Sequence, residues 1–417
     1  MGESQPAGLV RSDRHAAVPF WRDIRVLRWV FQIAILVVVA ALLYFLARNL
    51  IVNLEQLGLN LSFNFLTRRA GFSISEGGQI LDYGRTSKMW EAFLVGVLNT
   101  LRAVAVGIVL ATLLGLLVGI ARLSTNWLVN RIALSYIELM QNTPLLVQLF
   151  FWFTLIKALP RQRAGEILTL GDVHLGPLYV PPLAYFSQRA AALPGLQTHD
   201  SFRFYWPFIV LAFVLAGVLW TVRVRQMERR GVPPTGQFWW ALGGFFGTLV
   251  AGWLAVPGAP LSIVLPGLEG EAIANYTSGW ILSNTFQALL LGLVLYTAAF
   301  IAEVVRSGIQ AVPFGQIEAA TSLGLTNGQR LRLIVLPQAM RVIIPPLINQ
   351  YLNLTKNSSL AIAVAYPDLF NISQTIGNQT GQNIQVIALV MATYLVMSLV
   401  ISAIMNRVNK RMQIVER

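Results

Sequence analysis

The residues of this chain that are best placed to do chemistry form one short pattern in its last third. Glu318-Ala319-Ala320 precedes Gly324, and Ile334 and Leu336-Pro337 follow. Ala319 and Ala320 present almost no side chain, so another surface can approach the backbone closely there. The pattern therefore indicates a contact surface rather than a catalytic centre.

The residues around this pattern predict two short helices. Pro313-Phe314-Gly315 should end the preceding helix, because proline and glycine both disfavour its continuation. Residues 316–323 can form two helical turns, and Gly324 supplies the left-handed position that ends such a helix. Thr326, with Gln329 three residues later, matches a capping box that begins a second helix. We therefore expect helix, turn, helix, with the loop over residues 314–328; residues 314–330 are called the 314–330 segment below.

The composition indicates a membrane protein. Hydrophobic residues make up 55% of 417, and charged residues only 12%, whereas soluble domains carry about 25% charged residues. The net charge of +13 could suggest a nucleic-acid partner, but the placement of the basic residues favours membrane topology and no nucleic acid. Cysteine is absent, which excludes disulfides and thiolate metal sites, and the three histidines are scattered, so we expect no metal.

Hydropathy predicts an all-α integral membrane protein with about eight spans, since about 20 apolar residues cross a bilayer. Two of these runs are interrupted by polar residues and prolines, which a bilayer tolerates only where protein or water covers the freed backbone. The six clear runs are 29–47, 93–121, 204–222, 238–256, 280–302 and 385–405, and the interrupted runs are 132–156 and 333–354.

The interrupted runs are expected to face the bundle interior and to line a path for a polar solute. Asn349, Asn353 and Lys356 share one helical face by their spacing. Lys356 could meet a carboxylate or extend to the interface, and Glu138 could serve a gate, partner packing or helix pairing. The full set of path candidates is Glu138, Gln141, Asn142, Thr143, Asn349, Asn353, Lys356 and Asn357.

The distribution of Lys and Arg predicts the orientation of the chain. With the N-terminus inside, the inner segments hold 19 basic residues and the outer ones 10. Both termini and the 314–330 segment then lie in the cytoplasm. We interpret the first span as a retained anchor, because a signal peptide has a shorter apolar core and a small-residue cleavage site.

Taken together, these motifs resemble the permease subunits of ABC importers for polar and general L-amino acids, in the long form of Gram-negative bacteria. The resemblance rests on the pattern around Glu318 and also on Leu98-Asn99-Thr100, residues 142–149 and Leu336-Pro337-Gln338-Ala339. Gln141-Asn142 stands where the family commonly has Arg-Gly. The family implies a five-helix type I importer core with extra N-terminal and inserted spans.

This resemblance also implies an organisation along the chain. A basic cytoplasmic segment (1–28) precedes the anchor span (29–47) and a periplasmic segment (48–92). The importer domain (93–405) contains an insertion (157–279) with two spans and a compact extracytoplasmic part. A basic tail (406–417) ends the chain.

The resemblance implies several partners in the inner membrane. An ABC ATPase dimer would grip the 314–330 segment, with Glu318 anchored by a basic group of the partner or of the segment itself. A second permease subunit, a related chain or a second copy, and a periplasmic amino-acid-binding protein complete the machine. The residues expected to couple to the ATPase are Gly315, Glu318, Ala319, Ala320, Gly324 and Leu325.

No Gly-Lys pair exists in the chain, so a Walker phosphate loop is excluded. ATP and magnesium would therefore bind the partner ATPase, and we expect neither an enzyme nor a cofactor here. Two alternatives stay open. An ion-gradient-driven secondary transporter would need inverted repeats and midplane carboxylates. A non-transporting membrane assembly subunit would leave the interrupted spans unexplained.

Other features predict packing. Glu303 and Arg306 are three residues apart and should pair on a helix, and Arg102 is expected to pair across the bundle. A stripe of small residues at spacing four should form a close-packing face for another helix. The stripe consists of Gly107, Ala111, Gly115 and Gly119.

Overall fold

The computed structural model describes residues 24–56, 62–161, 167–170, 173–175, 178–180, 182–231, 236–269 and 275–412. Residues 1–23 of the expected basic segment therefore lie outside the described residues, and so do the last five residues of the tail. The chain divides into two units, residues 1–65 and 66–417. In the first unit, α1 (Ile24–Gln56) is a single apolar helix that carries the predicted anchor span. A 3-10 helix, η1 (Asn64–Thr67), lies at the unit boundary in the sequence.

The second unit is mainly helical, as expected. Its core helices are α2 (Met89–Arg122), α7 (Asn284–Gln310), α10 (Leu336–Asn357) and α12 (Asn383–Met412). The described residues contain seven helices long and apolar enough to span a membrane, or eight when one bent pair is counted as a span. This agrees with the eight spans predicted from hydropathy.

The small-residue stripe of α2 packs as predicted. All four of its residues are buried. A Cβ atom on Gly115 would lie 2.6 Å from the Ile301 Cβ of α7, and one on Gly119 would lie 2.8 Å from the Ala302 carbonyl oxygen. The two backbones therefore approach each other at a distance that only glycine permits.

The interrupted run 132–156 is a bent pair of helices rather than one straight span. α3 (Trp127–Asn142) and α4 (Leu145–Lys157) meet at an angle of 108°. Pro144 lies at the break, where it is extended and cannot continue the preceding helix. The second interrupted run continues as expected through Pro345 and Pro346, which both lie within α10.

The chain beyond α10 holds an element that hydropathy does not predict. A 3-10 helix, η4 (Ser358–Val364), leads to α11 (Leu369–Thr380), which packs against α2 and α12. Asp368 caps α11 by accepting a hydrogen bond from the Asn371 amide at 2.8 Å. Gly381, at φ +69°, ends the helix.

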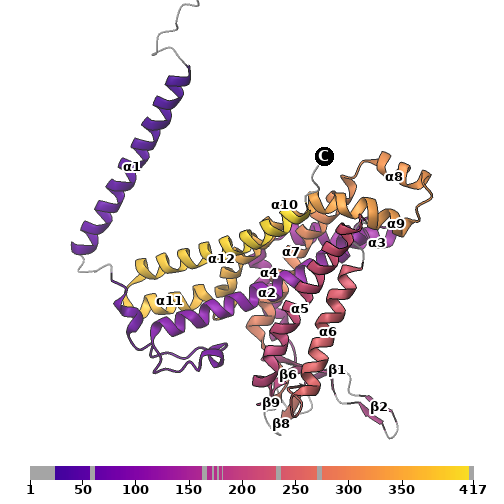
Figure 1. Cartoon of the computed structure of the whole chain (residues 1–417). Helices are drawn as coiled ribbons and strands as arrows, with labels where there is room; N and C mark the ends of the chain where they lie inside the picture. Colours follow the sequence, from indigo (N-terminus) through magenta and orange to yellow (C-terminus); the bar gives the residue numbers. More distant parts are fainter. Residues whose placement is uncertain are drawn as a thin grey trace, which may run out of the picture. The chain divides into compact units, whose positions relative to one another are not determined.

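The insertion combines a helical hairpin with short antiparallel strands. Its helices are α5 (Phe202–Arg229) and α6 (Gln237–Ala255), and the strands lie at the end of this hairpin away from α8 (Figure 1). One sheet has the order β1-β4-β5-β10, and three strand pairs accompany it. The strands are β1 (Leu168–Leu170), β2 (Val173–Leu175), β3 (Leu178–Val180), β4 (Ala184–Phe186), β5 (Ala190–Leu193), β6 (Gly195–Thr198), β7 (Leu261–Val264), β8 (Gly267–Glu269), β9 (Asn275–Ser278) and β10 (Trp280–Ser283).

These strands correct one predicted boundary. The span expected from residue 280 begins instead at Asn284, because Trp280–Ser283 form β10 and pair with β5. Ser283 is the N-cap of α7 and accepts a hydrogen bond from the Phe286 amide at 3.1 Å. The apolar run thus includes four residues of sheet before the helix.

Candidate functional site

The first helix of the 314–330 segment ends as the sequence predicts. α8 (Phe314–Ser322) is followed by Gly324 at φ +74°. The Gly324 amide donates to the Thr321 carbonyl at 2.9 Å, and the Leu325 amide donates to the Ala320 carbonyl at 3.2 Å. These two bonds form a Schellman motif, in which a left-handed residue satisfies the last carbonyls of the helix.

The second helix of the segment is fixed by the predicted capping box. α9 (Asn327–Arg330) begins at Thr326, whose amide donates to the Gln329 side-chain oxygen at 2.9 Å. Arg330 donates back to the Thr321 hydroxyl at 3.0 Å, which ties the two helices together. A π-helical turn, η3 (Leu331–Val335), then leads into α10. The segment is therefore preorganised by its own hydrogen bonds.

The outer surface of this segment is open. Glu318 and Ala319 are exposed, and the Glu318 carboxylate has no ion-pair partner among the described residues. Two large apolar side chains that the sequence reasoning missed, Phe314 and Leu323, are 70% and 81% exposed. Ala320, by contrast, is only 2% exposed, so its methyl group packs inward and only Ala319 faces outward. The exposed remainder suits close approach by another protein.

Of the other expected coupling residues, Gly315 is exposed and Leu325 is half-buried. A Cβ on Gly315 or on Gly324 would meet nothing within 4 Å. Space around these glycines is therefore free, and only the positive φ of Gly324 demands a glycine for backbone reasons.

One face of α10 is polar and exposed. Asn349, Asn353 and Lys356 all lie on it, whereas Tyr351 and Leu354 of the opposite face are buried in the core. Asn357 is half-buried. Within a membrane, exposed amides and an ammonium group require water or another protein beside them. The predicted common face is thus present, and it is directed away from this chain's own core.

The other polar candidates lie around the bend between α3 and α4. Gln141 donates through Nε2 to the Ala299 carbonyl of α7 at 3.2 Å, so it joins helices. Thr143 donates to the Leu139 carbonyl at 2.8 Å. Glu138 and Asn142 are exposed. Hydrogen bonds therefore hold two of the four in place, while the other two stay free to meet a solute or a partner.

Gln148, which the sequence reasoning did not single out, is 5% exposed and holds the bend between α3 and α4. Its Nε2 donates to the carbonyls of Met140 at 2.9 Å and Thr143 at 3.1 Å. Both acceptors lie where α3 ends and would otherwise lack partners. Its presence four residues after Pro144 is the only sequence signal of this role.

A polar cluster at the far end of α2 was also missed. Arg102 pairs with Glu76 at 2.8 Å, and its guanidinium lies 4.4 Å from the centre of the Phe286 ring. Asn99 donates through Nδ2 to the Glu76 carbonyl at 2.9 Å and to the Pro367 carbonyl at 2.8 Å. Arg102 thus pairs with a residue of the segment before α2, and not with another helix across the bundle as expected. The cluster fastens this segment to α2 and to the chain before α11.

Asp368 lies beside this cluster and is fully buried. Burial raises the pKa of its carboxyl group to about 7, although the hydrogen bonds it accepts at the start of α11 oppose the shift.

The predicted Glu303–Arg306 pair is confirmed, with Arg306 Nε donating to Glu303 at 2.9 Å. Among the described residues, no group of three or more His, Asp or Glu side chains could hold a metal.

Comparison with known proteins gives consistent results. Residues 238–414 match the family described as "Binding-protein-dependent transport system inner membrane component". A putative amino-acid ABC transporter permease protein of Escherichia coli, YhdX, is 42% identical over 93% of this chain and 95% of its own length. AapQ of Rhizobium johnstonii, a general L-amino acid transport system permease protein, is 38% identical over 93% of this chain and 92% of its own. BztB of Rhodobacter capsulatus, a permease protein of a glutamate/glutamine/aspartate/asparagine transport system, is 37% identical over 93% of each chain.

Proposed function

The chain belongs to the family of binding-protein-dependent transport system inner membrane components, as a transmembrane permease subunit of the ABC importer type, and we propose that it carries polar L-amino acids from the periplasm into the cytoplasm. Three relatives that align along nearly the whole chain are named as permeases for amino acids, and two of those names specify L-amino acids or four polar ones. This shared class supports polar L-amino acids as the substrate.

The observation that carries the mechanism is the exposed, preorganised 314–330 segment. It presents Phe314, Ala319 and Leu323 to a partner, with the Glu318 carboxylate free beside them. We propose that a dimeric ATPase grips this surface and that its basic groups meet Glu318. ATP and magnesium bind that partner, since this chain has no Walker loop.

The path itself requires a second permease subunit in this proposal. The polar face of α10 cannot face lipid, because unpaired polar groups in hydrocarbon are costly. A second subunit, related to this one or identical with it, would place its own α10 opposite, so that Asn349, Asn353 and Lys356 line a shared aqueous cavity. Closure of the ATPase would then move the 314–330 segments and switch the spans from inward-facing to outward-facing, as rigid bodies.

We further propose the bacterial inner membrane as the location, with both termini and the 314–330 segment in the cytoplasm. The excess of basic residues in the inner segments supports this orientation. A periplasmic amino-acid-binding protein would deliver the substrate at the opposite end, where the strands of the insertion and the cluster around Glu76 lie. The family's own description, which refers to a binding protein, supports this partner.

Co-purification of the ATPase tests the proposal. Glu318→Lys reverses one exposed charge on α8, and Gln379→Lys introduces the same group at an exposed site on α11, the matched control. We expect Glu318→Lys to reduce ATPase recovery by about tenfold, because reversal of a rim charge costs on the order of 1 kcal/mol or more. Gln379→Lys should leave recovery unchanged.

Uptake of radiolabelled amino acids by cells completes the test. We expect uptake to fall with ATPase recovery and to be competed by polar L-amino acids. Uptake that is abolished by a protonophore while cellular ATP is held constant, and that is indifferent to Glu318→Lys, would instead support the ion-driven alternative. Equal losses of ATPase from both lysine variants would show that Glu318 has no special part in docking.

A further inference from the structure

The hairpin of α5 and α6 packs on itself but scarcely on the rest of the described chain. The Tyr205 hydroxyl donates to the Leu249 carbonyl at 3.1 Å, and a Cβ on Gly252 would lie 2.6 Å from Phe208. Even with this internal seam included, only 6% of the apolar window of α5 and 11% of that of α6 are buried. Two spans that stand beside a bundle without packing on it leave a gap between themselves and the bundle.

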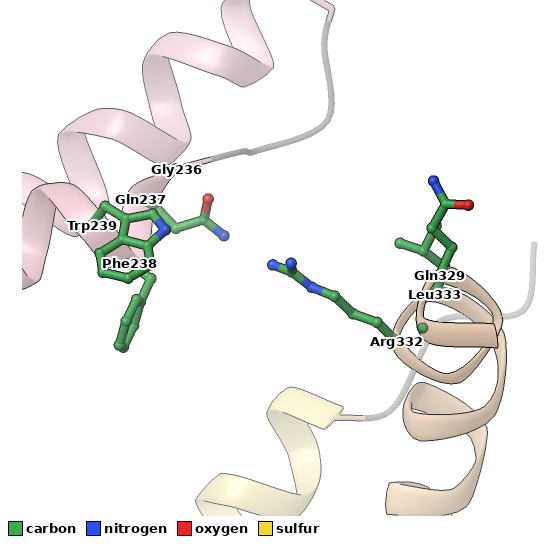
Figure 2. A pocket seen from close by; sticks show the side chains of 8 residues that line it. Gly236, Gln237, Phe238, Trp239, Gln329, Arg332 and Leu333 are labelled. Atoms are coloured by element: carbon green, nitrogen blue, oxygen red, sulfur yellow. The ribbon is translucent and has the colours of Figure 1, made fainter. Parts of the chain in front are cut away.

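This gap contains a cavity of about 810 Å³ at the end of the hairpin nearest the 314–330 segment. One wall is the start of α6, including Gln237 and Trp239, and the other is the α9–η3 turn, including Gln329 and Arg332. Figure 2 shows the Arg332 guanidinium extending across the cavity toward Gln237. Arg332 is the only charged residue among those that line it.

A second cavity, of about 410 Å³, lies beside α6 next to the first. Trp239 lines both, and the rest of the second lining is Leu219, Trp240, Gly243 and Gly244. This lining offers no charge and no amide or hydroxyl side chain. The Arg223 guanidinium lies 5.6 Å from the Trp240 ring, and its Nε is buried without a hydrogen-bond partner. The first cavity thus offers a cationic, amide-lined mouth, and the second, which shares Trp239 with it, an apolar interior; the two together are called the crevice below.

We propose that this crevice binds one anionic phospholipid. Its phosphate would lie between Arg332, Gln237 and Gln329, and an acyl chain would run over Gly243 and Gly244 beside Trp239. In the orientation proposed above, the mouth lies at the cytoplasmic headgroup level, where tryptophans gather and anionic lipids attract basic side chains. A water-soluble ATPase cannot enter the apolar interior, and the volume of each cavity lies within the usual range of small-ligand sites.

The bound lipid would join the inserted hairpin to the segment that docks the ATPase. Arg332 is placed by the π-turn η3, two residues after Arg330, and Arg330 holds α8 through Thr321. π-Turns within α-helices often mark functional positions. A headgroup held by Arg332 therefore acts on the same turn that fixes the docking helix, which gives the insertion a way to influence coupling.

Site-directed fluorescence quenching tests for the lipid itself, independently of transport. The chain has no cysteine, so Gly243→Cys accepts a single bimane label, and a side chain at Gly243 meets nothing within 4 Å. Gly217→Cys on α5 is the matched control, because Gly217 is equally open but lines neither cavity. The purified complex would be reconstituted in phosphatidylcholine nanodiscs that contain a minor fraction of phosphatidylglycerol, with either lipid brominated in its acyl chains.

The quantity compared is the quenching by each brominated lipid divided by its mole fraction. At position 243 we expect this value to be about fivefold higher for phosphatidylglycerol than for phosphatidylcholine, and at position 217 we expect no such enrichment. Arg332→Gln should abolish the enrichment, and Arg332→Lys should retain most of it. Gln237→Glu adds a negative charge at the mouth and should lower the enrichment. Because this variant keeps Arg332, its result does not depend on whether an Arg332 variant folds. Equal quenching by the two lipids at position 243, or enrichment that survives Arg332→Gln, would overturn the proposal. Quenching by neither lipid would overturn it as well, since protein would then fill the gap.

Discussion

The substitution Gly115→Ala should reveal how much the closeness of α2 and α7 contributes to stability. A methyl group on Gly115 would lie 2.6 Å from both Cβ and Cγ2 of Ile301 and 2.9 Å from the Ala298 carbonyl oxygen. Neither neighbour can withdraw easily, because Ile301 is 1% exposed and Ala298 contributes backbone. The two helices would therefore have to separate along their contact.

Gly107→Ala is the matched control on the same face of the same helix. Its methyl group would lie 3.4 Å from the Leu354 Cδ2, the end of a flexible side chain. Both substitutions gain up to about 1 kcal/mol of helix propensity, so this term cancels between them. Overpacking a close contact costs about 1–3 kcal/mol. We expect Gly115→Ala to be less stable than Gly107→Ala by about 2 kcal/mol.

Unfolding of the purified protein in mixed detergent by added dodecyl sulfate, followed by far-ultraviolet circular dichroism, would measure this difference. Gly107→Ala should unfold at or slightly above the midpoint of the unchanged chain, and Gly115→Ala clearly below it. Coincident midpoints for the two variants would refute the reasoning, because they would mean that α2 and α7 adjust at no measurable cost.

Two further outcomes follow from the buried groups near the far end of α2. The Asp368 carboxyl keeps its proton up to about pH 7 in the folded chain but releases it near its ordinary pKa of 3.8 in the unfolded chain. Folding therefore binds a proton between these pH values, and stability should fall as the pH rises from about 4 to about 7. Asp368→Asn can still cap α11, so its unfolding midpoint should be flat over this window and higher than that of the unchanged chain at pH 8. Glu76→Gln removes the ion-pair partner of Arg102, whose side chain is 23% exposed, so amide hydrogen exchange in residues 77–88 should quicken severalfold. The control, Glu91→Gln, alters only an exposed cap and should not change the exchange rate at residues 77–82.

The sequence predicts the helices of the fold well where apolar length decides. Spans such as α2 and α12 are long and predominantly apolar, and lipid leaves them no alternative to helix. The short strands escape prediction because β10 is only four residues long and pairs with β5, which lies far from it in the sequence. α11 escapes because it is short and half polar, so it carries no hydropathy signal.

The 314–330 segment was predictable because its determinants are local. Gly324, Thr326 and Gln329 lie within six residues and act on their own backbone. The inward orientation of Ala320 and the exposure of Leu323 depend on how α8 lies against the chain, which spacing alone does not fix. The Glu76–Arg102 pair is harder still to predict from the sequence, because a loop residue meets a helix residue only after the whole segment has folded back.

The pairing of β5 with β10 has a consequence for how this long chain accommodates its insertion. Leu193 stands opposite Trp280, and the Asn284 amide and side chain donate to the Arg189 and Gln188 carbonyls, both at 3.0 Å. The chain is thus already joined across the two ends of residues 194–279, which include the α5–α6 hairpin. A tight turn could connect Leu193 to Trp280, so residues 194–279 could be removed without disturbing the register of α7.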